Sequence, residues 1–582
     1  MVSSSSSWLG LLKKSWHRAK KNYLLIMMWV VTIIISNWVL LAKPMFYTHD
    51  YLHGARIAEY QRGLFEGQMP VIWSQNFGFG FGMPLFQFYA PLPYAVGALF
   101  YLLGLNLLIA VKMIIALSNI ATLMGGYIWA REFYNRKLST LSAAFLTLAS
   151  YRAMDIFARG AISEIWAIMA LPWLLAGITK IMHGKIKTGF WLSVAGGTIL
   201  ALSHNITTLL AAPFVIIYVM LLIMQWDKIK KNEAKLRIKN LLFAGMAVFG
   251  LAAFYLVPAF FEKNYTQVET FILGDYFNFR LHFLYFRQFL QDSFGYGGSG
   301  YGPDDGLSFF LGWAQLLGWM ITGLVISYQL ISNKGKIKKE KNKKIKWIAG
   351  IMLITIATMW MSTFKSQWLW EKLSSLLEFV QFPWRLLSLT IVFLSLVSVA
   401  GLSWLKEKWQ NVLISLLFLI LAISSFHYFQ GEKYLTEPAF YQGDEHYIRE
   451  SMSPILVDYL PSNFVFYDGL QAVAKDIKVL KMDKQPNIKV DKMDEKLYIF
   501  QNDQEMQVEL TVANYPGWVA EINGEKTNIG TSKLGNMLID LPAGEAALGL
   551  KLKSTPLRWW SNMISLITLL LLIRYGWDKD AN

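Results

Sequence analysis

The chain has 582 residues, of which 54% are hydrophobic and only 16% are charged, whereas a soluble protein carries about a quarter charged residues. It contains no cysteine, which excludes disulfides, zinc–thiolate sites and a cysteine nucleophile. The net charge of +16 is gathered in short loops between apolar runs, and no nucleic-acid-reading motif accompanies it. The charge therefore indicates membrane orientation, and no nucleic-acid partner is expected.

The N-terminal third of the chain combines long apolar runs with one polar loop. The run 23–41 follows basic residues and has no small-residue cleavage site after it, so we interpret it as an uncleaved first span with the N-terminus inside. The segment 43–106 is too polar to span as a whole, and three prolines interrupt its apolar half, 84–105. Placing the basic residue Arg131 inside requires an odd number of spans between Ala42 and Arg131, and the run 107–130 supplies one. Residues 84–105 are therefore predicted to be interfacial or re-entrant.

About twelve spans are predicted in all, with both termini inside. They lie near 23–41, 107–130, 138–153, 165–181, 189–204, 207–225, 241–259, 307–330, 347–363, 384–404, 410–427 and 557–575. The loops that fall inside all carry lysine or arginine, at 131–137, 180–187, 228–239, 334–346, 406–408 and 574. This regularity follows the positive-inside rule. It leaves three regions outside, namely 43–106, 260–306 and 428–556.

The last outer region differs in character from the rest. It alternates polar and apolar residues, as at 496–500 and 507–512, and contains the hairpin signal Asn523-Gly524. The expected fold is a polytopic α-helical membrane protein with an extracytoplasmic β-rich C-terminal domain. Its expected divisions are a transmembrane domain over 1–427 with a first outer loop over 43–106, the β-rich domain over 428–556, and a final helix and cytoplasmic tail over 557–582.

The first candidate site lies directly after the first span, at Thr48-His49-Asp50. A carboxylate at the boundary between membrane and water can act as a general base toward a hydroxyl group. Asp50 could equally cap a helix over 51–62, because aspartate is a favoured N-cap residue. His53 follows one helical turn after Asp50, and Arg56 one turn after His53. This set favours a site that handles an anionic carrier.

The second candidate lies between two predicted spans, in segment 151–164. Arg152, Asp155, Arg159 and Glu164 are costly near lipid unless they are paired or functional. Guanidinium groups offer a bidentate fork to phosphate oxygens. The alternative is a structural network of these arginines and carboxylates that anchors the loop.

The third and fourth candidates lie at the outer ends of two further spans. They are His204-Asn205, and the segment from Gln381 to Arg385. A histidine in such a place can be a hydrogen-bonded packing group. Trp384 can belong to an interfacial aromatic belt, and Arg385 can extend to the lipid headgroups. All four candidates fall on the outer side, which favours a common external cleft.

Several of these segments resemble a known family. The residues that carry the resemblance lie at 48–50, 67–73, 77–82 with Pro84, 88–92, 151–164, 204–205, 381–385 and 515–518. They are similar to bacterial membrane proteins described as 6-pyruvoyl-tetrahydropterin synthase-related, which themselves resemble YfhO-like glycosyltransferases of the GT-C class. No metal-binding histidine cluster or soluble synthase domain supports pterin chemistry.

The resemblance implies transfer of a sugar from a polyprenyl-phosphate carrier on the outer face of a bacterial plasma membrane. Asp50 matches the acidic residue of the first outer loop that acts as the base in GT-C enzymes. The expected catalytic residues are Asp50 and His53, and the expected phosphate ligands are Arg56, Arg152, Arg159 and Arg385. The expected substrate contacts are His49, Asp155, Glu164, His204, Asn205 and Gln381. The expected partners are a polyprenyl-phosphate sugar, a cell-surface glycan or teichoic-acid-type acceptor, and membrane lipid.

Two other functions and one cofactor question stay open at this point. A lipid-linked sugar flippase or other transporter also suits about twelve spans, but it predicts inverted repeats and charged residues in mid-span. A non-catalytic cell-envelope assembly protein would use the β-rich domain alone. No metal-ligating pair is evident, so no cofactor is assigned and a divalent metal stays an open question.

Overall fold

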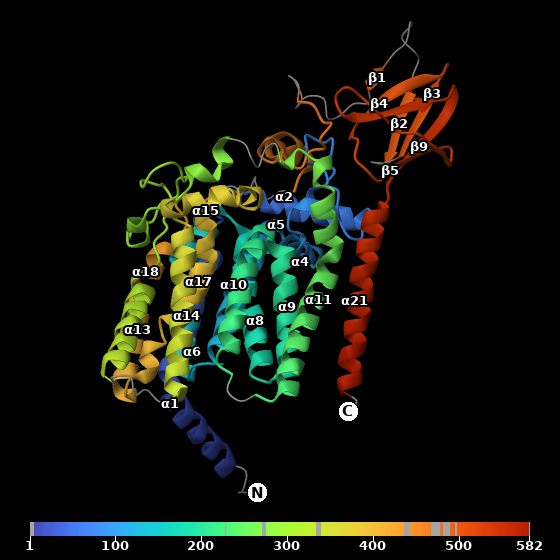
Figure 1. The fold of residues 1–582 in the computed structure, drawn as a ribbon. Coiled ribbons are helices and arrows are strands. Elements are labelled where there is room, and N and C mark those ends of the chain that lie inside the picture. Colours follow the sequence, from blue (N-terminus) through green and yellow to red (C-terminus); the bar gives the residue numbers. More distant parts are fainter. Residues whose placement is uncertain are drawn as a thin grey trace. The chain divides into compact units, whose positions relative to one another are not determined.

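The computed structural model describes residues 5–226, 229–269, 275–332, 339–435, 443–466, 478–480, 489–494 and 497–580 (Figure 1). The basic residues Lys228, Lys334, Lys336 and Lys338 and the strand residue Lys496 lie outside this part of the chain. The chain divides into two compact units. The helical unit comprises Met1–Tyr51, Lys112–Val248 and Asn278–Glu437, and the mixed unit comprises Leu52–Val111, Phe249–Phe277 and Pro438–Asn582.

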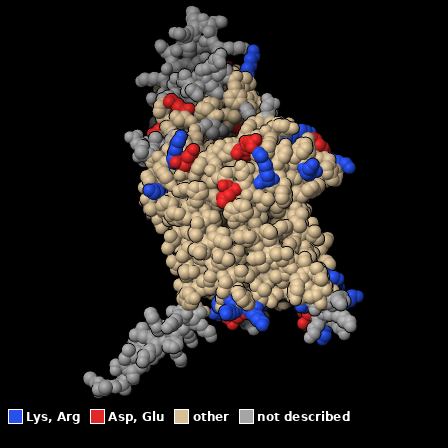
Figure 2. Space-filling view, turned by 90° about the vertical axis from the view of Figure 1, so that its left-hand side faces the viewer, with Lys and Arg blue, Asp and Glu red and all other residues tan. Residues whose placement is uncertain are grey.

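Eleven helical segments in the described ranges are long and apolar enough to cross a membrane. They are carried by α1 (Ser5–Ala42), α5 (Leu107–Ala130), α8 (Ile162–Met182), α9 (Ile186–Ser203), α10 (Asn205–Ile223), α11 (Lys231–Phe261), α13 (Trp313–Ser332), α14 (Lys339–Met361), α17 (Leu387–Val397) with its flanking turns, α18 (Glu407–Tyr428) and α21 (Pro556–Asp580). Figure 2 shows a face on which charged side chains gather toward the two ends of the helices and are sparse between them. Such a band fits a surface that contacts lipid. The predicted polytopic helical fold is confirmed.

The predicted span over 138–153 is not a continuous helix. α6 (Arg136–Thr147) ends after 12 residues, and the chain turns before α7 (Ser150–Met154) begins. The Ser425 hydroxyl donates a hydrogen bond of 3.1 Å to the carbonyl of Leu148, at the break. A helix can be interrupted at membrane depth when neighbouring side chains satisfy the freed backbone groups. The prediction of a twelfth continuous span here is therefore wrong.

Two spans form the centre of the helical unit. In an apolar stretch of 18 residues in each helix, 83% of the residues of α8 and 94% of those of the span Pro383–Trp404 are buried. α8 lies beside α9, and their close approach depends on small residues, because a Cβ added to Gly177 would lie 2.3 Å from the backbone nitrogen of Ser193. Small residues at helix contacts are typical of membrane proteins. Figure 1 shows α8, α9 and α10 running side by side.

The mixed unit contains residues 52–106 of the predicted first outer loop. Its helices are α2 (His53–Phe65), the single turn α3 (Leu85–Phe88) and α4 (Pro91–Leu102). α4 is apolar but has only 12 residues, whereas a perpendicular span needs about 20. This length agrees with the interfacial or re-entrant interpretation of 84–105.

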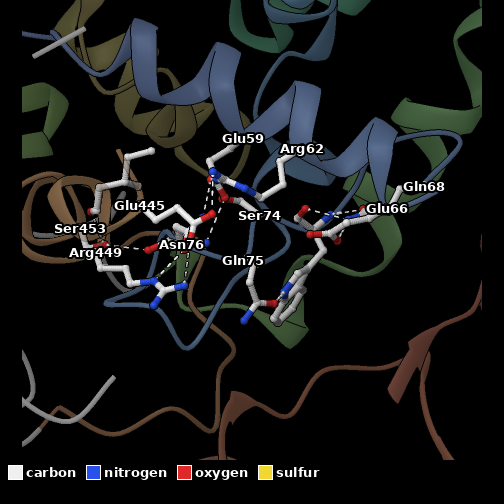
Figure 3. A network of polar contacts seen from close by, with 12 residues as sticks. Glu59, Arg62, Glu66, Gln68, Ser74, Gln75, Asn76, Glu445, Arg449 and Ser453 are labelled. Carbon is white, nitrogen blue, oxygen red and sulfur yellow. Dashed lines mark hydrogen bonds and ion pairs between the residues drawn. The ribbon is translucent and has the colours of Figure 1, made fainter. Parts of the chain in front are cut away.

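A buried carboxylate joins α2 to distant parts of the mixed unit (Figure 3). Glu59 accepts hydrogen bonds from the Ser74 hydroxyl at 2.6 Å and from the backbone and side chain of Asn76 at 3.0 and 2.7 Å, and it pairs with Arg62. The side-chain oxygen Oδ1 of Asn76 in turn accepts from Nε of Arg449 at 2.7 Å. Because these partners satisfy both oxygens of Glu59, the network stabilises the loop conformation.

The C-terminal part of the mixed unit is built from two antiparallel sheets, in the orders β1-β4-β8-β7 and β2-β3-β9-β5-β6. The strands are β1 (Lys478–Leu480), β2 (Lys489–Asp494), β3 (Leu497–Asn502), β4 (Met506–Ala513), β5 (Trp518–Ile522), β6 (Glu525–Thr527), β7 (Gly530–Thr531), β8 (Asn536–Leu541) and β9 (Gly544–Leu552). Asn523 and Gly524 both adopt positive φ, 50° and 90°, between β5 and β6. This is the predicted hairpin turn, and the β-rich C-terminal region is confirmed.

Candidate functional site

The segment after α7 forms an unusual turn in the helical unit. Asp155–Arg159 is a π-helical turn, and Gly160 ends it in the left-handed conformation, with φ 68°. The backbone N–H of Ala161 closes the turn on the carbonyl of Asp155 at 2.7 Å. Single π-turns change the angular phase of a helix and are frequent at functional sites. Here the turn sends Arg152 and Arg159 to different partners.

The segment Thr48-His49-Asp50 docks on this turn through its backbone. The N–H of His49 donates to the carbonyl of Ala158, and the N–H of Asp50 donates to the carbonyl of Arg159, each at 2.9 Å. A Cβ on Gly160 would lie 2.3 Å from the carbonyl oxygen of Asp50. Glycine is therefore required at 160 both for its φ and for this contact. The backbone of the half-buried Asp50 is thereby held beside Arg159, which is distant from it in the sequence.

Arg159 is the centre of an ion cluster. It pairs with Asp155 and donates to Glu164 at 2.7 Å. The Tyr151 hydroxyl donates to the other oxygen of Glu164, also at 2.7 Å. The guanidinium carbon of Arg159 lies 4.5 Å from the centre of the Trp384 ring, which is a cation–π distance. The side chain of Arg159 keeps 11% exposure, whereas those of Asp155 and Glu164 are buried.

Asp155 keeps unused hydrogen-bonding capacity. Burial and the neighbouring Glu164 raise the pKa of Asp155 above its usual range, and Arg159 opposes this rise. Its Oδ2 atom is buried and has no hydrogen-bond partner among the residues described.

His204 and Arg385 bring the other two predicted segments to the same cluster. Burial lowers the pKa of His204 to about 3, and the charges of Glu164, Arg385 and Arg159 also act on this pKa. The ring is therefore neutral at pH 7, and its Nδ1 atom accepts from the N–H of Thr207 at 3.2 Å, at the start of α10. All four predicted segments, 48–50, 151–164, 204–205 and 381–385, thus converge within the helical unit.

The segment that carries Arg385 is held in a strained and aromatic setting. Gln381 adopts φ 65°, which is uncommon for a residue other than glycine and costs of order 1–3 kcal/mol. The Arg385 guanidinium donates to the carbonyl of Val380 at 2.8 Å and to Oε1 of Gln381 at 3.1 Å. It also lies 4.9 Å from the centre of the Phe382 ring. Such strain is retained where it positions a side chain.

Arg152 points away from this cluster. Its guanidinium donates to Asn119 at 2.7 Å, to Ser118 at 3.3 Å and to Thr122, all on α5. The side chain is fully buried. These contacts join α7 to α5 and use most of the donors that a phosphate would need.

His53 and Arg56 lie in the mixed unit, apart from Asp50 in the division of the chain. The Nδ1 atom of His53 is 3.1 Å from the Tyr94 hydroxyl, to which Arg56 donates at 3.3 Å. The Arg56 guanidinium also lies 4.3 Å from the centre of the Tyr89 ring. Both residues are buried and form an aromatic cluster with α4.

The remaining predicted substrate contacts, His49 and Asn205, are exposed. His49 is exposed, and its Nε2 atom is 2.8 Å from the carbonyl oxygen of Tyr296. Asn205 is exposed at the first position of α10.

The sequence interpretation missed two buried residues beneath Trp384. The indole nitrogen of Trp384 donates to the Ser299 hydroxyl at 3.2 Å, and Ser299 is 2.8 Å from Nδ1 of His282. The rings of His282 and Phe382 are 4.5 Å apart. Trp384 is only 2% exposed, so it is not an interfacial belt residue. In the sequence, the neighbouring Phe382 and Arg385 already indicated that Trp384 belongs to a candidate site, whereas nothing in the sequence indicated a role for His282.

No group of three or more histidine, aspartate or glutamate side chains suited to a metal ion occurs within the described ranges. The carboxylates of Asp155 and Glu164 instead form ion pairs with Arg159.

Comparisons with known proteins agree with the resemblance read from the sequence. A sequence model of the family described as "6-pyruvoyl-tetrahydropterin synthase related domain; membrane protein" matches residues 86–286. An uncharacterized protein of Lactococcus lactis subsp. cremoris (strain MG1363) is 26% identical over 239 residues, which cover 39% of this chain and 38% of the relative. The chain thus matches well under half of that relative's length.

Among solved structures, the chain is similar to the arabinofuranosyltransferase AftD from Mycobacteria, with a TM-score of 0.40 and 12% identity. The match covers 70% of this chain and 26% of AftD. The R1389S mutant of AftD matches with the same TM-score and 14% identity, over 27% of its length. The chain therefore spans about a quarter of each AftD chain.

Proposed function

We propose that the protein is a membrane glycosyltransferase that moves a sugar from a polyprenyl-phosphate carrier to a cell-surface glycan or teichoic-acid-type acceptor on the outer face. The observation that carries this proposal is the convergence of Asp50, Arg159, His204 and Arg385 in the helical unit. A base and two arginines in one place suit a reaction in which a hydroxyl loses a proton and a phosphate gains charge.

In the proposed step, the acceptor oxygen forms a bond to the anomeric carbon of the donor sugar. The bond between that carbon and the carrier phosphate oxygen breaks, and its electron pair leaves with the phosphate. Asp50 takes the proton of the acceptor hydroxyl. Arg159 and Arg385 stabilise the charge on the departing phosphate, because a guanidinium pairs with two of its oxygens.

The direction of α8 supports a location on the outer face. The site lies at its first residues, where Glu164 pairs with Arg159. Its other end carries Lys180, which pairs with Glu132, and the following turn carries Lys185. Since basic loops stay inside, the site belongs to the opposite, outer side.

The test is a transfer assay with purified protein in lipid nanodiscs. A panel of radiolabelled undecaprenyl-phosphate sugars is incubated with cell-envelope acceptor, and labelled polymer is measured. We expect Asp50→Asn to lower the rate by about 10²–10⁴-fold, the usual contribution of general-base catalysis. The protein should stay folded, because the backbone bonds of Asp50 do not need its carboxylate.

Matched variants make this assay specific. Asp304→Asn alters an exposed acidic residue of the same unit and should transfer at the wild-type rate. Full activity in folded Asp50→Asn would falsify the assigned base. Movement of lipid-linked sugar across liposomes without any transferred label would instead favour a flippase.

A further inference from the structure

The mixed unit contains a pocket of about 590 Å³ that lies outside the cluster described above. Its walls come from Tyr265, the loop around Asn463, the start of β5 with the turn that leads into it, and the end of β6 with the residues that follow it. All of these belong to the mixed unit, so the pocket is internal to it. Its volume falls in the range of about 300–1,000 Å³ that small-molecule sites occupy.

Aromatic rings form one wall of the pocket. Tyr265 is 48% exposed, and its ring centre lies 6.5 Å from that of the buried Tyr515. Trp518 lines the pocket at the start of β5, and its ring centre lies 5.3 Å from that of Trp73, at 89°. Arg558 packs 4.9 Å from the centre of the Tyr515 ring. Because these neighbours hold the rings, the wall is formed before a ligand arrives.

Neutral hydrogen-bonding groups also line the pocket. Ser462, Asn463 and Asn528 are exposed lining residues, and Thr527, the last residue of β6, also lines the pocket. Each asparagine side chain offers a donor and an acceptor. Asn514 is held in place because it donates to the Thr531 hydroxyl at 2.7 Å.

The charge of the pocket narrows the ligand class. Among the described residues that line the pocket, Lys526 is the charged one and none is acidic. A lipid tail would require a mostly apolar lining, and a multiply charged phosphate would require several cations. Aromatic faces beside amides and hydroxyls instead match a ligand that has apolar C–H faces and a rim of hydroxyl groups.

We propose that this pocket binds a carbohydrate, as a short stretch of a neutral or weakly anionic glycan chain. Tyr265 stacks on one sugar ring, and Asn463 and Asn528 bond its hydroxyl groups. The further assignment of this glycan as the acceptor rests on the proposed transferase function, whereas carbohydrate binding itself does not.

The test measures binding by the full-length protein in nanodiscs, without any donor. The probes are tetra- to hexasaccharides of glucose, galactose, rhamnose and N-acetylglucosamine, with a glycerol-phosphate hexamer as the sugar-free polyanion. Isothermal titration calorimetry should show saturable binding of at least one saccharide. Tyr265→Ala and Asn528→Ala should each weaken that binding at least five-fold. Tyr276→Ala is the matched control, because Tyr276 is 51% exposed in the same unit and lies outside the pocket lining.

Each outcome bears on the pocket separately from the transfer reaction. Equal saccharide binding by wild type, Tyr265→Ala and Asn528→Ala would overturn the location, and binding of the glycerol-phosphate probe alone would overturn the ligand class. Failure of every saccharide to bind would also overturn the pocket while leaving transfer activity as a separate question. Saccharide binding by a protein that transfers no sugar would retain the pocket and reject the transferase.

Discussion

His204 is the residue whose protonation the fold controls most visibly. Burial and the cations Arg385 and Arg159 keep its pKa at about 3 in the folded state, despite the opposing charge of Glu164. In the unfolded chain, a histidine titrates near 6.5. Below about pH 6.5 the unfolded state therefore binds a proton that the folded state does not, so stability falls as pH is lowered toward 3.

His204→Asn should remove this pH dependence while retaining the cap of α10, because asparagine is also a favoured N-cap residue. We expect the fall in Tm between pH 7.5 and pH 5 to be smaller in the variant, by about 2 °C. Thermal unfolding of both proteins in the same detergent measures it. Equal falls would show that His204 is protonated in the folded protein.

The two arginines of segment 151–164 show where prediction from the sequence stops at this scale. Arg152 and Arg159 are seven residues apart, which in a regular helix places them on one face. The sequence predicted the same role for both, because each guanidinium offers a bidentate fork to phosphate oxygens. The π-turn Asp155–Arg159 separates them, so that Arg152 contacts α5 and Arg159 contacts Glu164. Nothing in the local sequence marks a π-turn.

The turn at Gly160 is the element that joins the Asp50 segment to the ion cluster. An alanine there must adopt φ 68°, and its Cβ would lie 2.3 Å from the carbonyl of Asp50 and 2.6 Å from the Thr48 hydroxyl. The left-handed conformation costs about 1–2 kcal/mol, and the contact must displace Thr48 and Asp50. We expect Gly160→Ala to lower transfer by about 10²-fold, the usual effect of a 1 Å misplacement.

The variant Gly104→Ala separates the effect of backbone strain from the effect of displacing Thr48 and Asp50. Gly104 has φ 91°, but nothing lies within 4 Å of its added Cβ. This control should lose a similar amount of stability from its φ and keep its transfer rate. Similar transfer rates in the two variants would mean that the docking of Asp50 on Gly160 does not matter for activity. Transfer is measured in nanodiscs, and stability by thermal unfolding.

At the level of elements, hydropathy and loop charge were enough to find the spans, and the alternation of polar and apolar residues was enough to find the β-rich region. They failed over 138–153, because the break after α6 depends on Ser425, which is 277 residues away from Leu148 in the chain. They also could not reveal the Glu59 network, in which Arg449 bonds a residue of the first outer loop. Contacts of this range leave no periodic pattern in the sequence.

At the scale of the whole molecule, the proposed function depends on which side of the membrane the site faces. The natural chain has no cysteine, so a single introduced cysteine reports on one position without background. Tyr301, in the segment 260–306 that is predicted to lie outside, is 76% exposed. Lys408 is exposed at the start of α18, in a predicted inner loop.

We expect a membrane-impermeant maleimide to label Tyr301→Cys in intact cells and to label Lys408→Cys only after permeabilisation. Asn205→Cys and Lys187→Cys, at the starts of α10 and α9, repeat the comparison. Asn205 adjoins His204, so its labelling reports the side of the candidate site directly. The reverse pattern would place Arg159 and Asp50 at the cytoplasmic surface. It would remove the outer polyprenyl-phosphate sugar as the donor, because the site would then face the cytoplasm. The basic loops would also face outward, against the positive-inside rule.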